Sequence, residues 1–252
     1  MNNSDFDRLV EEALAQDFSG WDFSWLHSRW YEEDPPWAYE AIVAEEKERI
    51  HSLLDMGTGG GEFLASLSPL PAHTVVTESY PPNIPIARAR LEPLGVEVVS
   101  FSDDKALPLK SSQFNLIINR HESYSLPELN RLLKPGGRFL TQQVGSQDCI
   151  QLNQFLNAPL ADVAASWTLE KEVNEFEDAG FHIERAEEAL LASHFYDIGA
   201  VVFFLKIIEW QIPDFTPRSY HDRLLTMHRY IKEHGAFKAK AHRYLIQARK
   251  PR

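Results

Sequence analysis

The chain of 252 residues is long enough for one large domain, and its hydrophobic share of 44% and charged share of 25% exclude a disordered protein. Its net charge of −12 argues against sequence-independent binding of nucleic acid, which depends on neutralising phosphates. The only cysteine, Cys149, excludes an intramolecular disulfide, and no apolar run approaches the roughly 20 residues that span a bilayer. We therefore expect a cytoplasmic protein that does not enter a membrane.

The first 49 residues are predicted to form a helical lid. They are acidic and rich in tryptophan. The pair Pro35-Pro36 must interrupt any helix, because proline lacks the backbone N–H that a helix interior uses. One helical segment is therefore expected before this pair, and another from about Trp37 to Arg49.

From residue 50 onward, strand-like and helix-like segments alternate. The predicted strands are 50–56, 74–78, 96–101, 114–119, 138–144 and 181–186, and the predicted helices are 62–68, 84–94, 126–133 and 168–179. This alternation specifies an α/β fold with a mainly parallel, doubly wound sheet that helices cover on both faces. A last strand, 243–248, can pair antiparallel at the sheet edge. Residues 190–240 are expected to form an insertion that caps the carboxyl edge of the sheet.

A glycine-rich turn, Asp55-Met56-Gly57-Thr58-Gly59-Gly60-Gly61, follows the first predicted strand of this region. Its glycines allow positive φ angles and close approach of a ligand to the backbone. Glu62 occupies the third small position of the dinucleotide fingerprint, so a nicotinamide-dependent dehydrogenase is disfavoured. Asp55 would repel a pyrophosphate but suits an ammonium group. Glu78, at the end of the next strand, can accept two hydrogen bonds from a ribose diol.

With these residues in place, the chain resembles the class I S-adenosylmethionine-dependent methyltransferases. The segment Asp55–Gly61 matches the family motif E/D-x-G-x-G-x-G at every specified position, and Glu78 matches its ribose-binding acid. Residues 102–109, 114–119 and 126–139 resemble the segments around the family's third, fourth and fifth strands. The resemblance covers about 50–145 closely and 165–252 more loosely. It implies a Rossmann-like, seven-stranded sheet whose last strand is antiparallel, with 50–252 as the methyltransferase domain.

The resemblance also implies roles for individual residues toward S-adenosylmethionine. Asp55 and the loop would face its methionine portion, Glu78 its ribose, Asp103 its adenine, and Asn119 the sulfonium. Asp104 is an open choice between an adenine contact and a solvated loop acid. The implied cofactor-binding residues are Asp55, Gly57, Thr58, Gly59, Gly61, Glu78, Asp103, Asp104 and Asn119.

The residues that act on the methyl acceptor are less well marked. Methyl transfer from a sulfonium depends mainly on alignment, so it needs a general base only when the acceptor must lose a proton. His121 follows the fourth strand and has a suitable pKa range for a base, with a surface-loop histidine as the alternative. The candidate substrate residues are Arg29, Trp30, Tyr31 and Trp37 in the lid and Tyr196 in the insertion. The histidines do not have metal-like spacing, so we expect no metal.

The leading hypothesis is methyl transfer to a small molecule, with an oxygen acceptor slightly favoured, by a monomer or homodimer. One alternative is an RNA or protein methyltransferase, because residues 216–252 contain 10 basic and 2 acidic residues and could form a docking face. Another is a cofactor-binding regulator without catalytic activity.

Overall fold

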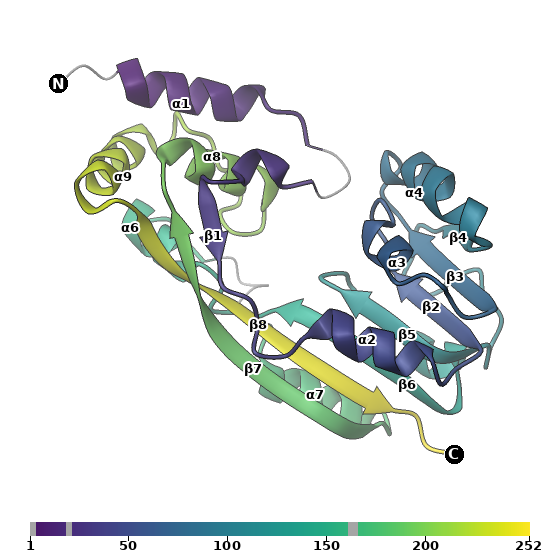
Figure 1. The fold of residues 1–252 in the computed structure, drawn as a ribbon. Coiled ribbons are helices and arrows are strands. Elements are labelled where there is room, and N and C mark those ends of the chain that lie inside the picture. The colour runs from purple at the N-terminus through teal and green to yellow at the C-terminus, as the bar shows by residue number, and fades with distance from the viewer. Residues whose placement is uncertain (1–3, 19–21, 161–165) are drawn as a thin grey trace.

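The computed structural model describes residues 4–18, 22–160 and 166–252, which form one eight-stranded sheet with surrounding helices (Figure 1). The strands lie in the order β1-β7-β8-β6-β5-β2-β3-β4. Their bounds are β1 (Trp30–Glu32), β2 (Ser52–Met56), β3 (His73–Glu78), β4 (Glu97–Ser100), β5 (Phe114–Arg120), β6 (Leu133–Val144), β7 (His182–Phe195) and β8 (Phe237–Arg249). The helices are α1 (Ser4–Ala15), α2 (Tyr39–Lys47), α3 (Glu62–Ser66), α4 (Asn83–Leu91), α5 (Leu126–Leu132), α6 (Ile150–Leu156), α7 (Leu169–Asp178), α8 (Ile198–Ile207) and α9 (His221–His234), with short 3-10 helices η1 (Ser24–Leu26) and η2 (Glu92–Leu94).

The parallel half of the sheet consists of β2 to β6. β2 pairs with β3 and β5, β3 pairs with β4, and β5 pairs with β6, all in parallel. Strands covered on both faces are nearly continuous apolar runs, and all five residues of β2 are buried. The carboxyl ends of parallel strands meet at one edge, so the turns after β2, β3 and β5 lie near one another.

Two hydrophobic layers cover this half of the sheet, because successive side chains of a strand point to opposite faces. Leu53 packs with residues of α2, α3 and α4 on one face. Its neighbour Leu54 packs with residues of α5 and α7 on the other face. The doubly wound α/β fold class predicted from the sequence is therefore confirmed.

The antiparallel half of the sheet is built on two long strands. β8 pairs antiparallel with both β6 and β7, as expected for the last strand, but it lies between them and not at the sheet edge. The fully buried run 243–246 of β8 fits this interior position. β7 and β8 have 14 and 13 residues, more than twice the common strand length of about 5–6. Strand β1 pairs antiparallel with β7 and adds an eighth strand to the seven expected.

The far ends of β7 and β8 carry a second hydrophobic core, which we call the cap (Figure 1). It contains buried residues of α1, η1, α6, α8 and α9, together with Phe195 of β7 and Phe237 of β8. The apolar run 198–205 forms most of α8 and is buried throughout. The cap therefore joins the beginning of the chain to its C-terminal third.

The structure also shows what the predicted segments 1–49 and 190–240 contain. The first contains β1 between its helices, and α2 packs on the sheet with α3 and α4. The second begins inside β7 and ends inside β8. The division into a lid, 1–49, and a methyltransferase domain, 50–252, stays a prediction. None of the described helices is both long and apolar enough to cross a membrane.

Candidate active site

The glycine-rich turn joins β2 to α3 and is held against β3. The backbone N–H groups of Gly57 and Thr58 donate to the Thr77 carbonyl at 3.0 and 3.1 Å. Gly57 has a φ of +70°, and a Cβ atom there would lie 2.5 Å from Cγ of Glu122. Because an L side chain is unfavourable at that φ and has no room, the turn requires glycine at this position.

Glu78, the last residue of β3, holds the glycine-rich turn in place through hydrogen bonds. Its two carboxylate oxygens accept from the Gly59 N–H at 2.8 Å and the Tyr80 N–H at 2.7 Å, and the residue is only 4% exposed. A carboxylate offers about four lone-pair positions, so two remain for a ligand. Glu78 therefore fixes the loop and keeps the capacity to bind a diol.

Asp55 is a buried acid beneath the same turn. Burial raises its pKa to about 6 even though the Thr58 hydroxyl and Arg120 lower it, and the nearby Glu78 adds to the rise. Above that pH, the folded protein holds a desolvated carboxylate that a cationic ligand would stabilise.

We expect Asp55→Asn to stabilise the ligand-free protein at pH 7.5. A carboxyl whose pKa is raised by folding contributes stability that is fully present below its unfolded pKa of 3.8 and is lost as the pH rises through about 6. Two pKa units correspond to about 3 kcal/mol in the free energy of unfolding. In urea denaturation, the free energy of unfolding of the variant should exceed that of the original protein by up to this amount at pH 7.5, and the two should be equal near pH 4. The exposed acid Glu233 provides the control Glu233→Gln, and an equal gain in both variants would contradict the assignment.

Asn119 is the penultimate residue of β5, and its side chain is fully buried. Its Oδ1 accepts from Thr141 Oγ1 at 2.8 Å and from Gln143 Nε2 at 2.6 Å, and its carbonyl accepts from the Tyr39 hydroxyl at 3.0 Å. Its Nδ2 has no hydrogen-bond partner within the described residues. The end of β5 thus holds one unused buried donor.

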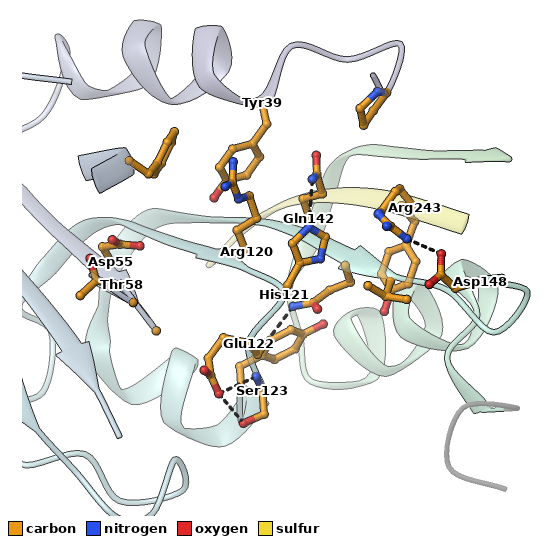
Figure 2. A pocket seen from close by; sticks show the side chains of 18 of the residues that line it. Tyr39, Asp55, Thr58, Arg120, His121, Glu122, Ser123, Gln142, Asp148 and Arg243 are labelled. Atoms are coloured by element: carbon orange, nitrogen blue, oxygen red, sulfur yellow. Dashed lines mark hydrogen bonds and ion pairs between the residues drawn. The ribbon is translucent and has the colours of Figure 1, made fainter. Parts of the chain in front are cut away.

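A cavity of about 1760 Å³ extends from the glycine turn to the cap (Figure 2). Asp55, Gly57, Thr58 and Gly59 line one part of it, and His121 lies in its wall. The part toward the cap is lined by Phe23, Trp30, Glu32, Trp37, Gln142, Asp148, Trp167, Phe204, Ile208, Trp210 and Arg243. Ligand pockets usually measure about 300–1,000 Å³, so the cavity has room for two small molecules side by side.

His121 sits where the chain turns sharply after β5, with a φ of +59°. Its Nε2 lies 3.3 Å from Nε2 of Gln142, and its backbone N–H donates to the Gln142 carbonyl at 2.9 Å. Desolvation, together with the positive charges of Arg243 and Arg120, lowers the pKa of the imidazole to about 3. The ring nevertheless remains open to the cavity, and it is neutral at physiological pH.

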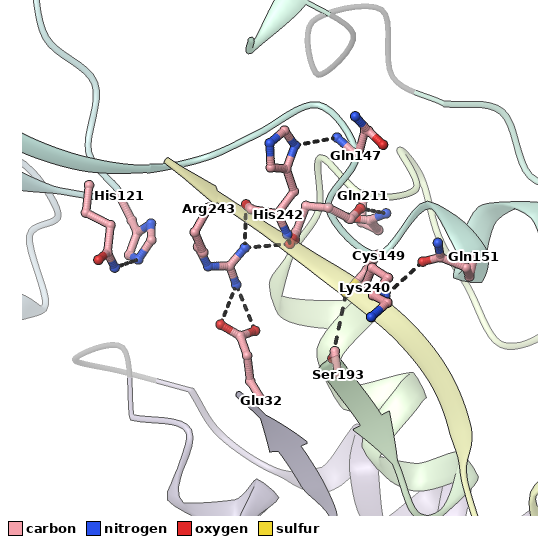
Figure 3. A network of polar contacts seen from close by, with 12 residues as sticks. Glu32, His121, Gln147, Cys149, Gln151, Ser193, Gln211, Lys240, His242 and Arg243 are labelled. Carbon is pink, nitrogen blue, oxygen red and sulfur yellow. Dashed lines mark hydrogen bonds and ion pairs between the residues drawn. The ribbon is translucent and has the colours of Figure 1, made fainter. Parts of the chain in front are cut away.

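An ion triad of Arg243, Glu32 and Asp148 lines the cavity; Figure 3 shows the Arg243–Glu32 pair and Figure 2 the Arg243–Asp148 pair. Arg243 of β8 donates from Nη2 to both oxygens of Glu32 at 2.9 and 2.8 Å, and from Nη1 to Asp148 Oδ1 at 2.5 Å. Burial raises the pKa of Glu32, while Arg243 lowers it. The triad connects β1, β8 and the segment after β6, so it holds the cap side of the cavity together.

The candidate substrate residues separate into two groups. Trp30 and Trp37 line the cavity. Arg29 forms a bidentate ion pair with Asp197 at 2.7 and 2.9 Å and is not part of the lining. Tyr31 and Tyr196 are 47% and 42% exposed and also lie outside it.

The candidate cofactor residues also differ in position. Gly61, Glu78 and Asn119 are buried around the cavity but do not line it. Asp103 is an exposed loop residue that accepts from the Lys105 N–H at 2.9 Å. Asp104 is half-buried, and its charge helps raise the pKa of Glu122. Their roles toward a cofactor stay predictions, as does the absence of a metal, although no group of three metal-binding side chains occurs in the described part of the chain.

Several residues of the cavity wall were not predicted. Arg120 and Glu122 flank His121 and follow the same strand end, so the signal that pointed to His121 could have included them. Gln142 lies near the carboxyl end of the predicted strand 138–144, and this position at a strand end could have pointed to it in the same way. The triad has no local signal, since Glu32 and Arg243 are 211 residues apart.

The fold and the glycine turn define a methyltransferase-type α/β protein, and comparisons with known proteins agree. The family model described as a methyltransferase domain matches residues 38–186, which are 149 of 252 residues. The chain therefore belongs to the methyltransferase-domain family, and the resemblance predicted from its sequence is confirmed. This membership identifies the matched region as a methyltransferase domain.

The individual proteins that this chain resembles have low sequence identity to it. The uncharacterized methyltransferase YcgJ of Bacillus subtilis (strain 168) is 27% identical over 125 residues, 46% of this chain and 49% of the relative, so the match spans about half of that protein. A structure of BH2331, a proposed methyltransferase from Bacillus halodurans C-125, aligns with a TM-score of 0.61 at 18% identity and covers 84% of this chain and 99% of its own. An S-adenosylmethionine-dependent methyltransferase from Aquifex aeolicus aligns with a TM-score of 0.50 at 17% identity over 99% and 98%. At these identities the structures share the fold alone.

Proposed function

We propose that this protein transfers the methyl group of S-adenosylmethionine to a small molecule, by in-line displacement, with an oxygen atom slightly favoured as the acceptor. The observation that carries the proposal is the cavity, which continues from the glycine turn into a space walled by cap residues such as Trp30, Trp210 and Phe204. A small acceptor in that space would lie between the sheet edge and the cap.

The cofactor side of the cavity fits its proposed ligand in three ways. Gly57 leaves a cradle that a Cβ atom would fill. Asp55 supplies a desolvated carboxylate for the ammonium of the methionine portion, and Glu78 has acceptor capacity for the ribose. Asn119 is also proposed to lie near the sulfonium, and Asp103 and Asp104 are proposed to face the adenine. When bound, S-adenosylmethionine supplies the electrophilic methyl group.

The alternative of an RNA or protein acceptor depends on the basic segment 216–252. In the structure this segment comprises α9 in the cap and β8, which begins beside α9 and runs through the sheet to the opposite end of the molecule (Figure 1). Several of its charges are neutralised within the protein: Lys232 pairs with Asp5, and Arg243 with Glu32 and Asp148. A continuous basic docking face is therefore disfavoured, and the small-molecule acceptor is preferred.

The proposal predicts where a labelled methyl group goes. Purified protein is incubated with S-adenosylmethionine labelled in the methyl group and, separately, with small-molecule, RNA and protein fractions of a cell extract. We expect label in the small-molecule fraction alone, with turnover that changes little between about 50 and 200 mM salt, since no polyanion is bound. Label in RNA with a steep loss at higher salt would contradict the proposal, and labelled protein would favour the protein alternative. No label in any fraction, together with cofactor binding, would favour a non-catalytic regulator.

A cytoplasmic location and a monomeric or homodimeric state remain part of this proposal. The single cysteine is buried and unpaired, which is compatible with a reducing environment.

A further inference from the structure

Three polar side chains from separate elements meet in the lining of the cavity. Trp37 lies just before α2, Gln142 lies in β6, and His121 follows β5. The Trp37 indole donates from Nε1 to Gln142 Oε1 at 2.7 Å, and Gln142 Nε2 lies 3.3 Å from His121 Nε2 (Figure 2). Trp37 and Gln142 are 2% and 8% exposed, so solvent does not compete for the hydrogen bond between them.

The direction of each hydrogen bond follows from the donor inventory of the side chains. An indole N–H can only donate, so Gln142 must turn its Oε1 toward Trp37. The amide nitrogen of Gln142 then faces His121 and donates to its Nε2. A ring nitrogen that accepts carries no proton, so the neutral imidazole carries its proton on Nδ1.

The position and charge of the ring are fixed as well. Arg120 pairs with Gln142 in the β5–β6 ladder, and this register brings the His121 backbone to the Gln142 carbonyl. Nδ1 has no partner within the described residues, and the ring is open to the cavity. The cationic neighbours of the ring are Arg120 of β5 and Arg243 of β8. The nearby acids are Glu32 and Asp148, which pair with Arg243, and Glu122, the next residue in the chain. Together with desolvation, the two arginines keep the imidazole neutral.

We infer that His121 holds the methyl acceptor by donating a hydrogen bond from Nδ1 and does not serve as its general base, with Gln142 and Trp37 as the positioning residues that fix this role. The inference rests on the proposed function and deepens it. It identifies the acceptor as a small molecule that carries a hydrogen-bond-accepting oxygen at or beside the methylated atom. The acceptor atom reacts in its deprotonated form, having lost its proton to solvent. The bond between the methyl carbon and sulfur breaks as the bond to the acceptor forms, S-adenosylhomocysteine leaves, and no proton passes to His121.

Two substitutions separate a donor from a base. Asparagine tolerates the φ of +59° at position 121, and its Nδ2 takes the place of imidazole Nδ1, but it cannot accept a proton. In the labelled-methyl assay with a small-molecule extract, we expect His121→Asn to keep turnover within about threefold of the original protein. His121→Ala should lose about 10- to 100-fold, because it removes one hydrogen bond to the acceptor. Equal loss in both variants, with unchanged binding of S-adenosylhomocysteine, would overturn the donor role.

A second readout needs no turnover. Nitrogen NMR shifts of the ligand-free protein should show His121 protonated on Nδ1 and bare on Nε2. Gln142→Glu should reverse this pattern, since a carboxylate accepts from both the Trp37 indole and His121 Nε2–H. An Nε2-protonated or cationic ring in the unsubstituted protein at neutral pH would overturn the inference.

The chain contains a matched control for the NMR experiment. His73 Nε2 lies 2.7 Å from Gln113 Nε2, and Gln113 Oε1 accepts from the Lys110 N–H at 3.1 Å, so the same geometry occurs at an exposed site. Gln113→Glu should move the His73 signals and leave those of His121 unchanged.

If the His121 tautomer is as expected but S-adenosylhomocysteine does not bind, the proposed function fails and the hydrogen-bond geometry stands.

Discussion

Arg243→Met is expected to lower the free energy of unfolding by about 3–5 kcal/mol. The substitution leaves the carboxylates of Glu32 and Asp148 without their cation, and these side chains are only 20% and 9% exposed. Each has lost much of its hydration, so the protein must either tolerate unpaired charges or bind protons to neutralise them. Urea denaturation at neutral pH measures the loss, which should shrink as the pH falls and the carboxyls become protonated.

Two controls test whether the loss comes from the unpaired charges. Arg138 also pairs with two acids, Glu184 and Glu46, but its side chain is 38% exposed. Arg138→Met should therefore cost less than about 1 kcal/mol. Adding Glu32→Gln and Asp148→Asn to Arg243→Met should recover most of the stability. If Arg138→Met costs as much as Arg243→Met, the buried triad does not have the role assigned to it.

Glu78→Ala is expected to weaken binding of S-adenosylhomocysteine by about 1.5–3 kcal/mol, or 10- to 150-fold, because charge-assisted hydrogen bonds to the ribose are lost. Isothermal titration calorimetry measures this directly. Glu97, exposed at the beginning of β4, provides the control Glu97→Ala, whose affinity should not change.

Glu78 also holds the Gly59 and Tyr80 N–H groups, so the substitution could act by loosening the turn. A ligand that lacks the ribose hydroxyls, the 2′,3′-dideoxy analogue of S-adenosylhomocysteine, separates the two causes. If Glu78 binds the ribose, the analogue should bind the variant and the original protein equally. An equal loss for both ligands would remove the ribose assignment and leave Glu78 as a loop residue.

The parallel half of the fold could be predicted because its signals are local. The run Leu53–Met56 followed by glycines marks a buried strand and a turn. Lys134–Gly137 marks the end of the preceding helix, although β6 begins at Leu133, earlier than the predicted start at 138. Boundaries differ mainly where pairing extends a strand beyond its apolar run: 181–186 was expected where β7 runs from His182 to Phe195. Its additional residues are ordered by pairing with β8, a partner about 50 residues away along the chain.

In the candidate site too, residues marked by local sequence patterns could be predicted, and contacts that depend on distant parts of the chain could not. Asp55, Gly57, Gly59 and His121 lie at or just after strand ends and line the cavity, while their roles toward a cofactor stay predictions. Arg29 was grouped with Trp30 because the two are neighbours in sequence, yet it is turned away to pair with Asp197. The contact between Gln142 and His121 depends on the β5–β6 register, which single-sequence patterns do not specify.

The central claim is that the cavity at the glycine turn binds S-adenosylmethionine. Calorimetric titration of the purified protein with S-adenosylhomocysteine, with NADH as the control ligand, tests it most directly. The structure predicts binding of S-adenosylhomocysteine alone at micromolar affinity, about −8 kcal/mol. Binding of neither ligand, or of NADH alone, would contradict the claim.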